Sequence, residues 1–153
     1  MKVKTIKAVE AYRALKALKV SGMSDDAMLA VWKNLKALRP ISETYDKDIE
    51  EVRATLQDEE FEKMQQRVKE AQERELHAKE EARDMTAAEK REIAEINEWF
   101  AVWNKKGKEY FNSLSEKEVE VDIDSLDASE LLKSFKSSDR TFEDVATLDW
   151  LTK

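Results

Sequence analysis

The chain has 153 residues and a net charge of −7, with 40% of its residues charged and 41% hydrophobic. It contains no cysteine, which excludes disulfides, zinc–thiolate sites and thiol catalysis. No stretch approaches the roughly 18 consecutive apolar residues of a membrane span, so we expect a soluble, cytoplasmic protein with a single domain over residues 1–153.

The N-terminal part of the chain is basic and predicts a pair of helices. Residues 1–40 contain nine Lys and Arg residues against three acidic ones. Thr5 is the expected N-cap of a first helix that runs to about Lys19. Ser24 is the expected cap of a second helix, which Pro40 ends, so that residues 5–39 form an αα-hairpin. The apolar residues of the second helix recur every three or four positions and predict its buried face: Met28, Val31, Trp32, Leu35 and Leu38.

The middle of the chain predicts two long helices. Residues 41–106 contain neither glycine nor proline and are rich in Glu, Lys, Arg, Gln and Ala, which enter helices at low cost. We expect one helix over residues 42–83, with the serine at its first position as N-cap. We expect another over residues 87–114, because Thr86 and Glu89 have the spacing of a capping box.

The two long helices are expected to form an antiparallel hairpin. Both have an apolar face, and the chain reverses direction near residues 84–86 in this interpretation. The reversal predicts which apolar residues meet: Leu56 lies against Leu114, and Val68 lies against Trp103. The charged tip of the hairpin, residues 72–92, then projects into solvent.

An acidic strand pattern follows the helices. Residues 119–124 alternate between β-branched apolar and acidic residues, which is typical of a strand with one acidic face. A single strand is not stable alone, and residues 1–5 are its best partner inside the chain. We expect two basic side chains to face two acidic ones: Lys2 with Glu120, and Lys4 with Asp122.

The last part of the chain predicts two short helices, capped by Asp127 and by Thr141. Residues 115–153 therefore form a strand followed by two helices. The expected fold is mainly α: an elongated antiparallel helical hairpin or bundle with a short N-terminal αα-hairpin and a small α+β C-terminal segment.

The residue types that build catalytic and metal sites are sparse. His77 is the only histidine, and Arg74 occupies the position where a bundle metal site of the Glu-x-x-His type needs a carboxylate. Two widely separated glycines cannot form a glycine-rich phosphate loop. We therefore expect no enzyme, no catalytic or metal site, no cofactor and no small-molecule substrate.

Five residues are the candidate contacts with a partner. Each tryptophan has two interpretations, since Trp99 and Trp150 either pack in the core or present an aromatic contact. The basic residues Lys33, Lys36 and Arg39 share the second helix and give the alternative of a nucleic-acid-binding module. We do not expect nucleic acid, because acidic residues at positions 25 and 26 open that helix and repel phosphate.

The order of the segments resembles a group of small uncharacterised helical phage and prophage proteins. The segments that carry the resemblance are a basic start leading into Ala14-Leu15-Lys16-Ala17-Leu18, a charged helical middle, the acidic stretch 118–124, and the ending Leu148-Asp149-Trp150-Leu151. The resemblance implies a mobile-element origin and a role in assembly, with no catalytic residues to carry over. The leading interpretation is a non-enzymatic protein-interaction or assembly module that binds an unknown protein partner or a second copy of itself. A nucleic-acid-binding module is the first alternative, and a carboxylate-dependent metal enzyme is the second.

Overall fold

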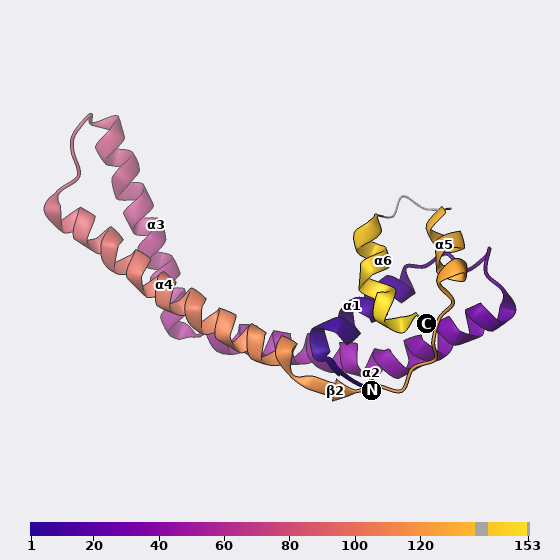
Figure 1. Cartoon of the computed structure of the whole chain (residues 1–153). Coiled ribbons are helices and arrows are strands. Elements are labelled where there is room, and N and C mark those ends of the chain that lie inside the picture. The colour runs from indigo at the N-terminus through magenta and orange to yellow at the C-terminus, as the bar shows by residue number, and fades with distance from the viewer. Residues whose placement is uncertain (137–140, 153) are drawn as a thin grey trace. The chain divides into compact units, whose positions relative to one another are not determined.

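The computed structural model describes residues 1–136 and 141–152, and the described chain is mainly α-helical with one small antiparallel sheet (Figure 1). This confirms the predicted fold class. The chain groups into two compact units, residues 1–48 with 113–153 and residues 49–112. We call them unit 1 and unit 2 and describe each by itself. The single domain stays a prediction, and positions 137–140 and 153 of the predicted C-terminal segment lie outside the described residues.

Unit 1 contains the sheet. Strand β1 (Lys2–Lys4) pairs antiparallel with strand β2 (Glu118–Glu120), which confirms the predicted partner. Lys2 lies opposite Glu120, as predicted, but Lys4 lies opposite Glu118 and not opposite Asp122. The difference follows from the antiparallel direction, in which residue numbers fall along one strand as they rise along the other.

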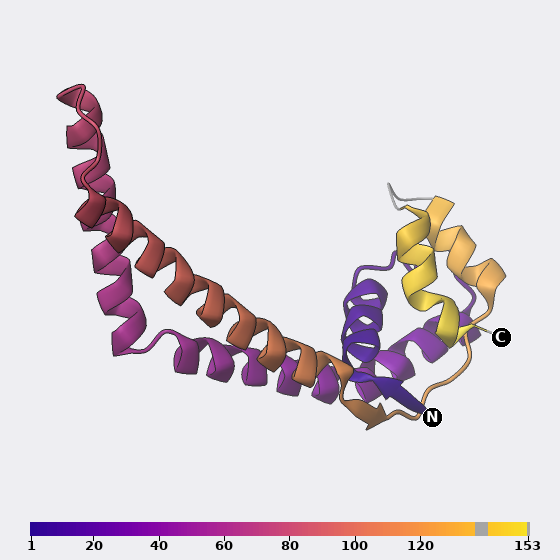
Figure 2. The same ribbon diagram turned by 60° about the vertical axis from the view of Figure 1, so that its left-hand side comes forward.

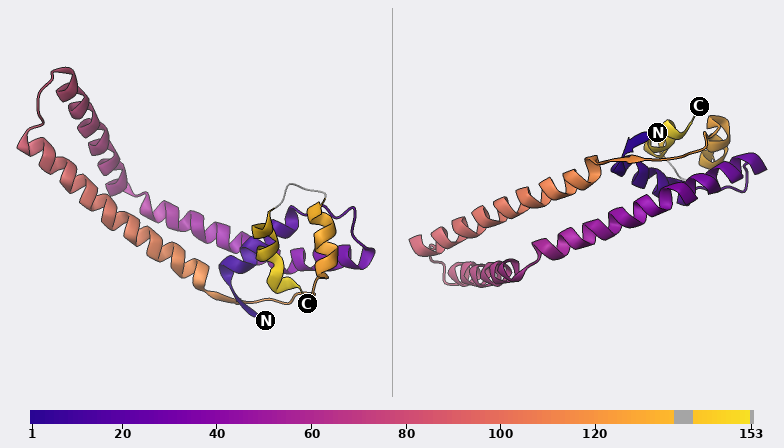
Figure 3. Two further views of the ribbon diagram at one scale, coloured as in Figure 1. Left: turned by 45° about the horizontal axis from the view of Figure 1, so that its top comes forward. Right: turned by 90° about the horizontal axis from the view of Figure 1, so that it is seen from below.

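Helices make up most of unit 1 and contribute most of its core (Figure 3). They are α1 (Thr5–Lys16), the first part of α2 (Asp25–Leu56), the end of α4 (Ala87–Glu116), α5 (Ala128–Lys136), α6 (Phe142–Leu148) and the 3₁₀ turn η1 (Asp149–Leu151). The buried apolar side chains of these helices and of the segments between them form one cluster: Ala8, Ala11, Leu15, Met23, Val31, Leu38, Val121, Leu126, Leu131, Phe135, Leu148 and Leu151.

The predicted helix starts are right for the two short C-terminal helices and wrong for the first helix. Asp127 accepts hydrogen bonds from the N–H and hydroxyl of Ser129, and Asp144 accepts from the N–H of Thr141. Thr5, however, is the first residue inside α1, and Lys4 is the N-cap. The Thr5 hydroxyl instead donates to the carbonyl oxygen of Lys117, because the helix starts directly at the end of a paired strand.

Helix α2 passes through Pro40, which corrects the prediction that this proline ends a helix and that Ser42 caps the next one. A proline inside a helix removes one backbone hydrogen bond and crowds the preceding turn. Leu38 and Ser42, on either side of it, are both buried, whereas the proline itself is exposed. The packing of α2 on unit 1 therefore outweighs the local cost of Pro40.

The helix predicted over residues 42–83 is interrupted instead at Gln57 and Asp58, in unit 2 (Figure 2). Helix α3 (Glu59–Glu80) begins after this break, and the Asp58 carboxylate accepts a hydrogen bond from the N–H of Phe61 at 2.9 Å. A skipped position in the apolar pattern just before Phe61 was the signal of this break in the sequence.

The chain reversal in unit 2 is confirmed, since α3 and α4 run side by side in opposite directions (Figures 1 and 3). The capping box at Thr86 and Glu89 is also present. The predicted register is wrong by about two turns, because Leu56 lies against Gly107, and Trp103 stacks on Phe61 at 4.9 Å and not on Val68. Helix α3 ends earlier than predicted, so the loop of residues 81–86 takes up more of the chain than a sharp turn would.

Candidate interaction surfaces

The only histidine of the sequence lies among carboxylates on α3. His77 is exposed on α3, and its Nδ1 lies 3.6 Å from a carboxylate oxygen of Glu80, one turn along the same helix. Within residues 1–136 and 141–152, no three His, Asp or Glu side chains are grouped closely enough to hold a metal ion. In the same part of the chain, no helix has the length and apolar character needed to cross a membrane.

The three candidate basic residues of α2 each have a neighbour in the chain. The Lys33 ammonium lies 3.2 Å from a carboxylate oxygen of Asp124. The Arg39 guanidinium donates to Glu43 at 2.7 Å, and this hydrogen bond raises the pKa of Arg39. The Lys36 ammonium lies 4.6 Å from the ring centre of Trp32, a cation–π contact. The structure therefore spreads these residues along α2 with local partners and does not gather them in one basic cleft.

Trp32 is exposed, which corrects its predicted place in the core. The buried positions around it are Val31, Asn34 and Leu38, so the buried face of α2 is centred on a polar residue. Hydrophobic periodicity does not select an asparagine as a buried residue. The predicted buried face of α2 is therefore turned around the helix axis toward the tryptophan.

Trp150 is partly buried against the core of unit 1. Its indole N–H is buried and has no hydrogen-bond partner among the described residues. The aromatic ring is thus mainly a packing anchor of η1, with a polar group that the described chain leaves unsatisfied.

Trp99 lies at the edge of an aromatic cluster in unit 2. Its indole N–H donates to Glu60 at 3.0 Å, and its ring makes an edge-to-face contact with Phe100 at 5.0 Å. The neighbouring Trp103 donates to the carbonyl oxygen of Leu56 at 2.9 Å, at the end of α2 where that oxygen has no partner in the next turn. Two tryptophans are therefore held in place at the break between α2 and α3.

These tryptophans line a hollow of about 260 Å³, which we call the α4 hollow. Its residues come from both sides of the helix break and from α4: Thr55, Leu56, Asp58, Glu60, Trp99, Val102, Trp103 and Lys106. Val102 is 65% exposed, an unusual exposure for a valine on a regular helix that already buries another face. Trp99, one of the predicted contacts, therefore lies in a hollow beside an exposed apolar residue.

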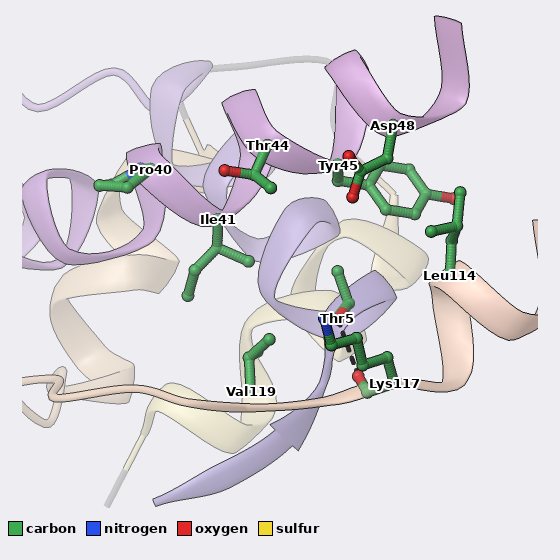
Figure 4. Close-up of a pocket in the computed structure, with 9 residues that line it drawn as sticks. All are labelled: Thr5, Pro40, Ile41, Thr44, Tyr45, Asp48, Leu114, Lys117 and Val119. Carbon is green, nitrogen blue, oxygen red and sulfur yellow. Dashed lines mark hydrogen bonds between the residues drawn. The ribbon is translucent and has the colours of Figure 1, made fainter. Parts of the chain in front are cut away.

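A second pocket, of about 270 Å³, lies in unit 1 between α2 and the sheet (Figure 4). We call it the strand pocket. The α2 side contributes Pro40, Ile41, Thr44, Tyr45 and Asp48, and the opposite side contributes Thr5, Leu114, Lys117 and Val119. The hydroxyl groups of Tyr45 and Ser115 lie 2.9 Å apart in a hydrogen bond that fixes the tyrosine ring. No motif in the sequence marks this pocket, because its two walls lie some 70 residues apart in the chain.

No family model, no curated protein and no solved structure matches this chain.

Proposed function

We propose that the protein is a non-enzymatic protein-interaction or assembly module, and that it contacts a protein partner through the α4 hollow. The observation that carries the proposal is the exposed Val102 beside two tryptophans whose indole N–H groups are already bonded within unit 2. Aromatic side chains that are held rigid lose little entropy on binding, and they commonly dominate the affinity of an interface.

The chemistry of the hollow indicates the kind of contact. Its lining combines the apolar residues Leu56 and Val102 and two tryptophans with Asp58, Glu60 and Lys106, so that an apolar anchor with polar groups beside it fits the hollow. The exposed ring of Tyr110 lies two turns further along α4 from Val102 and extends the apolar surface. The resemblance to phage and prophage proteins supports an assembly role of the same kind.

The proposal is tested by site-specific crosslinking in the full chain. A benzoylphenylalanine at position 106, an exposed residue that lines the hollow, should yield a defined protein adduct. The same probe at position 66, an exposed site on α3, serves as the control. Val102→Asp should abolish the adduct and weaken binding of the purified partner at least tenfold. An adduct that forms equally from both positions, or that survives Val102→Asp, contradicts the proposal.

The alternative of a nucleic-acid-binding module is less favoured, because Lys33 and Arg39 already form ion pairs with carboxylates of the chain. Titration with a labelled duplex and a labelled single strand at two salt concentrations tests it. Binding that falls steeply with salt would favour that alternative. We expect no binding at low salt.

A further inference from the structure

Strand β2 uses one set of its backbone groups to pair with β1. The N–H of Val121 donates to the carbonyl oxygen of Met1 at 2.8 Å, and the N–H of Thr5 donates to the carbonyl oxygen of Lys117 at 2.8 Å. In an antiparallel pair, residues that exchange hydrogen bonds alternate with residues whose N–H and C=O groups point to the other side. The backbone N–H and C=O groups of residues 117, 119 and 121 therefore point toward β1. Those of Glu118 and Glu120 point away from it.

That outer edge of β2 is open. Within the part of the chain that the structure describes, no hydrogen bond engages the backbone N–H or C=O groups of Glu118 and Glu120. The same edge is closed further along, where both backbone groups of Asp124 bond to the side chain of Asn34. An exposed edge strand is a template on which a further strand can pair.

The acidic side chains of β2 determine which charge on an added strand is favourable. Glu118, Glu120 and Asp122 are exposed, and the first two lie opposite Lys4 and Lys2 of β1. A third strand would place its own residues opposite the same glutamates on their other side, where a cation is favourable and an anion is not. A second copy that paired through its own β2 would bring carboxylates together, so this edge discourages self-pairing.

The strand pocket determines which side chain fits between the two basic residues of the added strand. The side chain of Val119 lines this pocket, together with Ile41 and Pro40 of α2 (Figure 4). A residue that lies opposite Val119 on an added strand has its side chain on the same face of the sheet, toward the pocket. Because most of the exposed lining of the pocket is apolar, an apolar side chain fits there.

We infer that the outer edge of β2 binds an extended segment of a partner protein in which basic and apolar residues alternate, with the apolar side chain seated in the strand pocket. Main-chain hydrogen bonds to Glu118 and Glu120 supply the affinity, and the carboxylates and the pocket supply the sequence preference. The segment Lys2-Val3-Lys4, which occupies the inner edge of the same strand, has the same alternation.

A labelled peptide of sequence Lys-Val-Lys-Val-Lys, with blocked ends, tests the inference by fluorescence anisotropy with the full chain. We expect saturable binding at low salt. A peptide with every backbone amide N-methylated, and the peptide Lys-Gly-Lys-Gly-Lys, should each bind at least tenfold more weakly. The first has lost its donors and the second its apolar side chains. Equal binding of either one overturns the inference, as does an absence of binding by the unmodified peptide.

Variants of the protein locate the site. Glu118→Lys should weaken binding at least tenfold and Glu118→Gln several-fold, whereas Glu62→Lys, the same charge change at an exposed position of α3, should not. A melting curve identifies any variant that fails to fold, and Glu118→Gln keeps the size of the side chain. Unchanged binding by Glu118→Gln and Glu118→Lys overturns the inference. So does sedimentation that finds self-association lost in Glu118→Lys, because a second copy would then occupy the edge. Val102→Asp should leave peptide binding unchanged, which separates this inference from the proposed use of the α4 hollow.

Discussion

The side chain of Asn34 forms two hydrogen bonds with the backbone of Asp124, as a neighbouring strand would. Its Nδ2 donates to the carbonyl oxygen at 2.8 Å, and its Oδ1 accepts from the N–H at 2.7 Å. Asn34 is completely buried in α2. This pair ties the helix to the extended segment after β2 and satisfies backbone groups that would otherwise lack partners.

Replacement of Asn34 by leucine should therefore destabilise the protein. The change leaves the partly buried N–H and C=O of Asp124 without their partners, and each such group costs about 1–3 kcal/mol. We expect the free energy of unfolding to fall by about 3 kcal/mol, measured by urea denaturation. The matched control is Asn104→Leu on the exposed side of α4, which should change it by less than about 0.5 kcal/mol. A similar small change for Asn34→Leu would refute the structural role of the pair.

Local signals in the sequence predicted the elements that depend on local chemistry. The capping residues Asp127, Thr141 and Thr86 are predictable because each bonds to neighbours within three or four residues. The alternating pattern likewise predicts a strand, but β2 covers residues 118–120 and not the whole of 119–124. The path of α2 through Pro40 and the burial of Asn34 were not recognised, since both depend on packing between distant segments. Tertiary packing therefore outweighs the helix-breaking tendency of the proline.

Pro40→Ala tests this explanation directly. Alanine restores a backbone N–H that can donate to the carbonyl oxygen of Lys36 and removes the crowding of the ring. Replacement of the proline also raises the conformational entropy of the unfolded chain, which offsets part of the gain in stability. We expect a net stabilisation of about 1–2 kcal/mol, seen as a higher melting temperature. Thr44→Ala, one turn further along α2, is the control for a change at the same surface. A lower melting temperature for Pro40→Ala would contradict the explanation.

Gly107 allows a matched pair of substitutions inside α4. A Cβ atom at this position would lie 3.4 Å from Cδ1 of Leu56, at the limit of ordinary van der Waals contact. Because glycine costs a helix about 1 kcal/mol relative to alanine, Gly107→Ala should stabilise the protein by about 0.5–1 kcal/mol. Gly107→Leu should instead destabilise it by about 1–3 kcal/mol, because its longer side chain overlaps Leu56. Thermal unfolding of the two variants measures both effects, and a stabilising leucine would show that α4 does not pack against Leu56 as described.

The surfaces were harder to predict than the fold. Trp99, a predicted contact beside an apolar face, lies in the α4 hollow, but nothing in the sequence indicates that Val102 next to it is exposed. Periodicity places apolar residues in a core and has no means of recognising one that the core leaves exposed. The open edge of β2 was missed for a related reason, since an acidic alternating strand predicts pairing without indicating which of its two edges stays unpaired.

The carboxylates of Asp127 and Glu130 should make stability depend on pH. Hydrogen bonds from the Ser129 side chain and backbone lower the pKa of Asp127, and a hydrogen bond from Lys133, followed by one from the N–H of Ser24, lowers the pKa of Glu130. Both groups thus hold protons less tightly in the folded protein than in the unfolded chain.

Their contribution to stability is therefore complete above the pKa values of the unfolded chain, roughly pH 4–5, and is lost as the pH falls through the lower folded values. The double variant Asp127→Asn with Glu130→Gln should melt below the natural protein at pH 7. The difference should shrink as the pH is lowered toward about 2, where the natural carboxyls are protonated as well. Calorimetry across this range measures the difference, with Glu62→Gln plus Glu73→Gln on α3 as the matched control for the loss of two charges. A difference that stays constant down to low pH would show that these hydrogen bonds do not favour the ionised carboxylates.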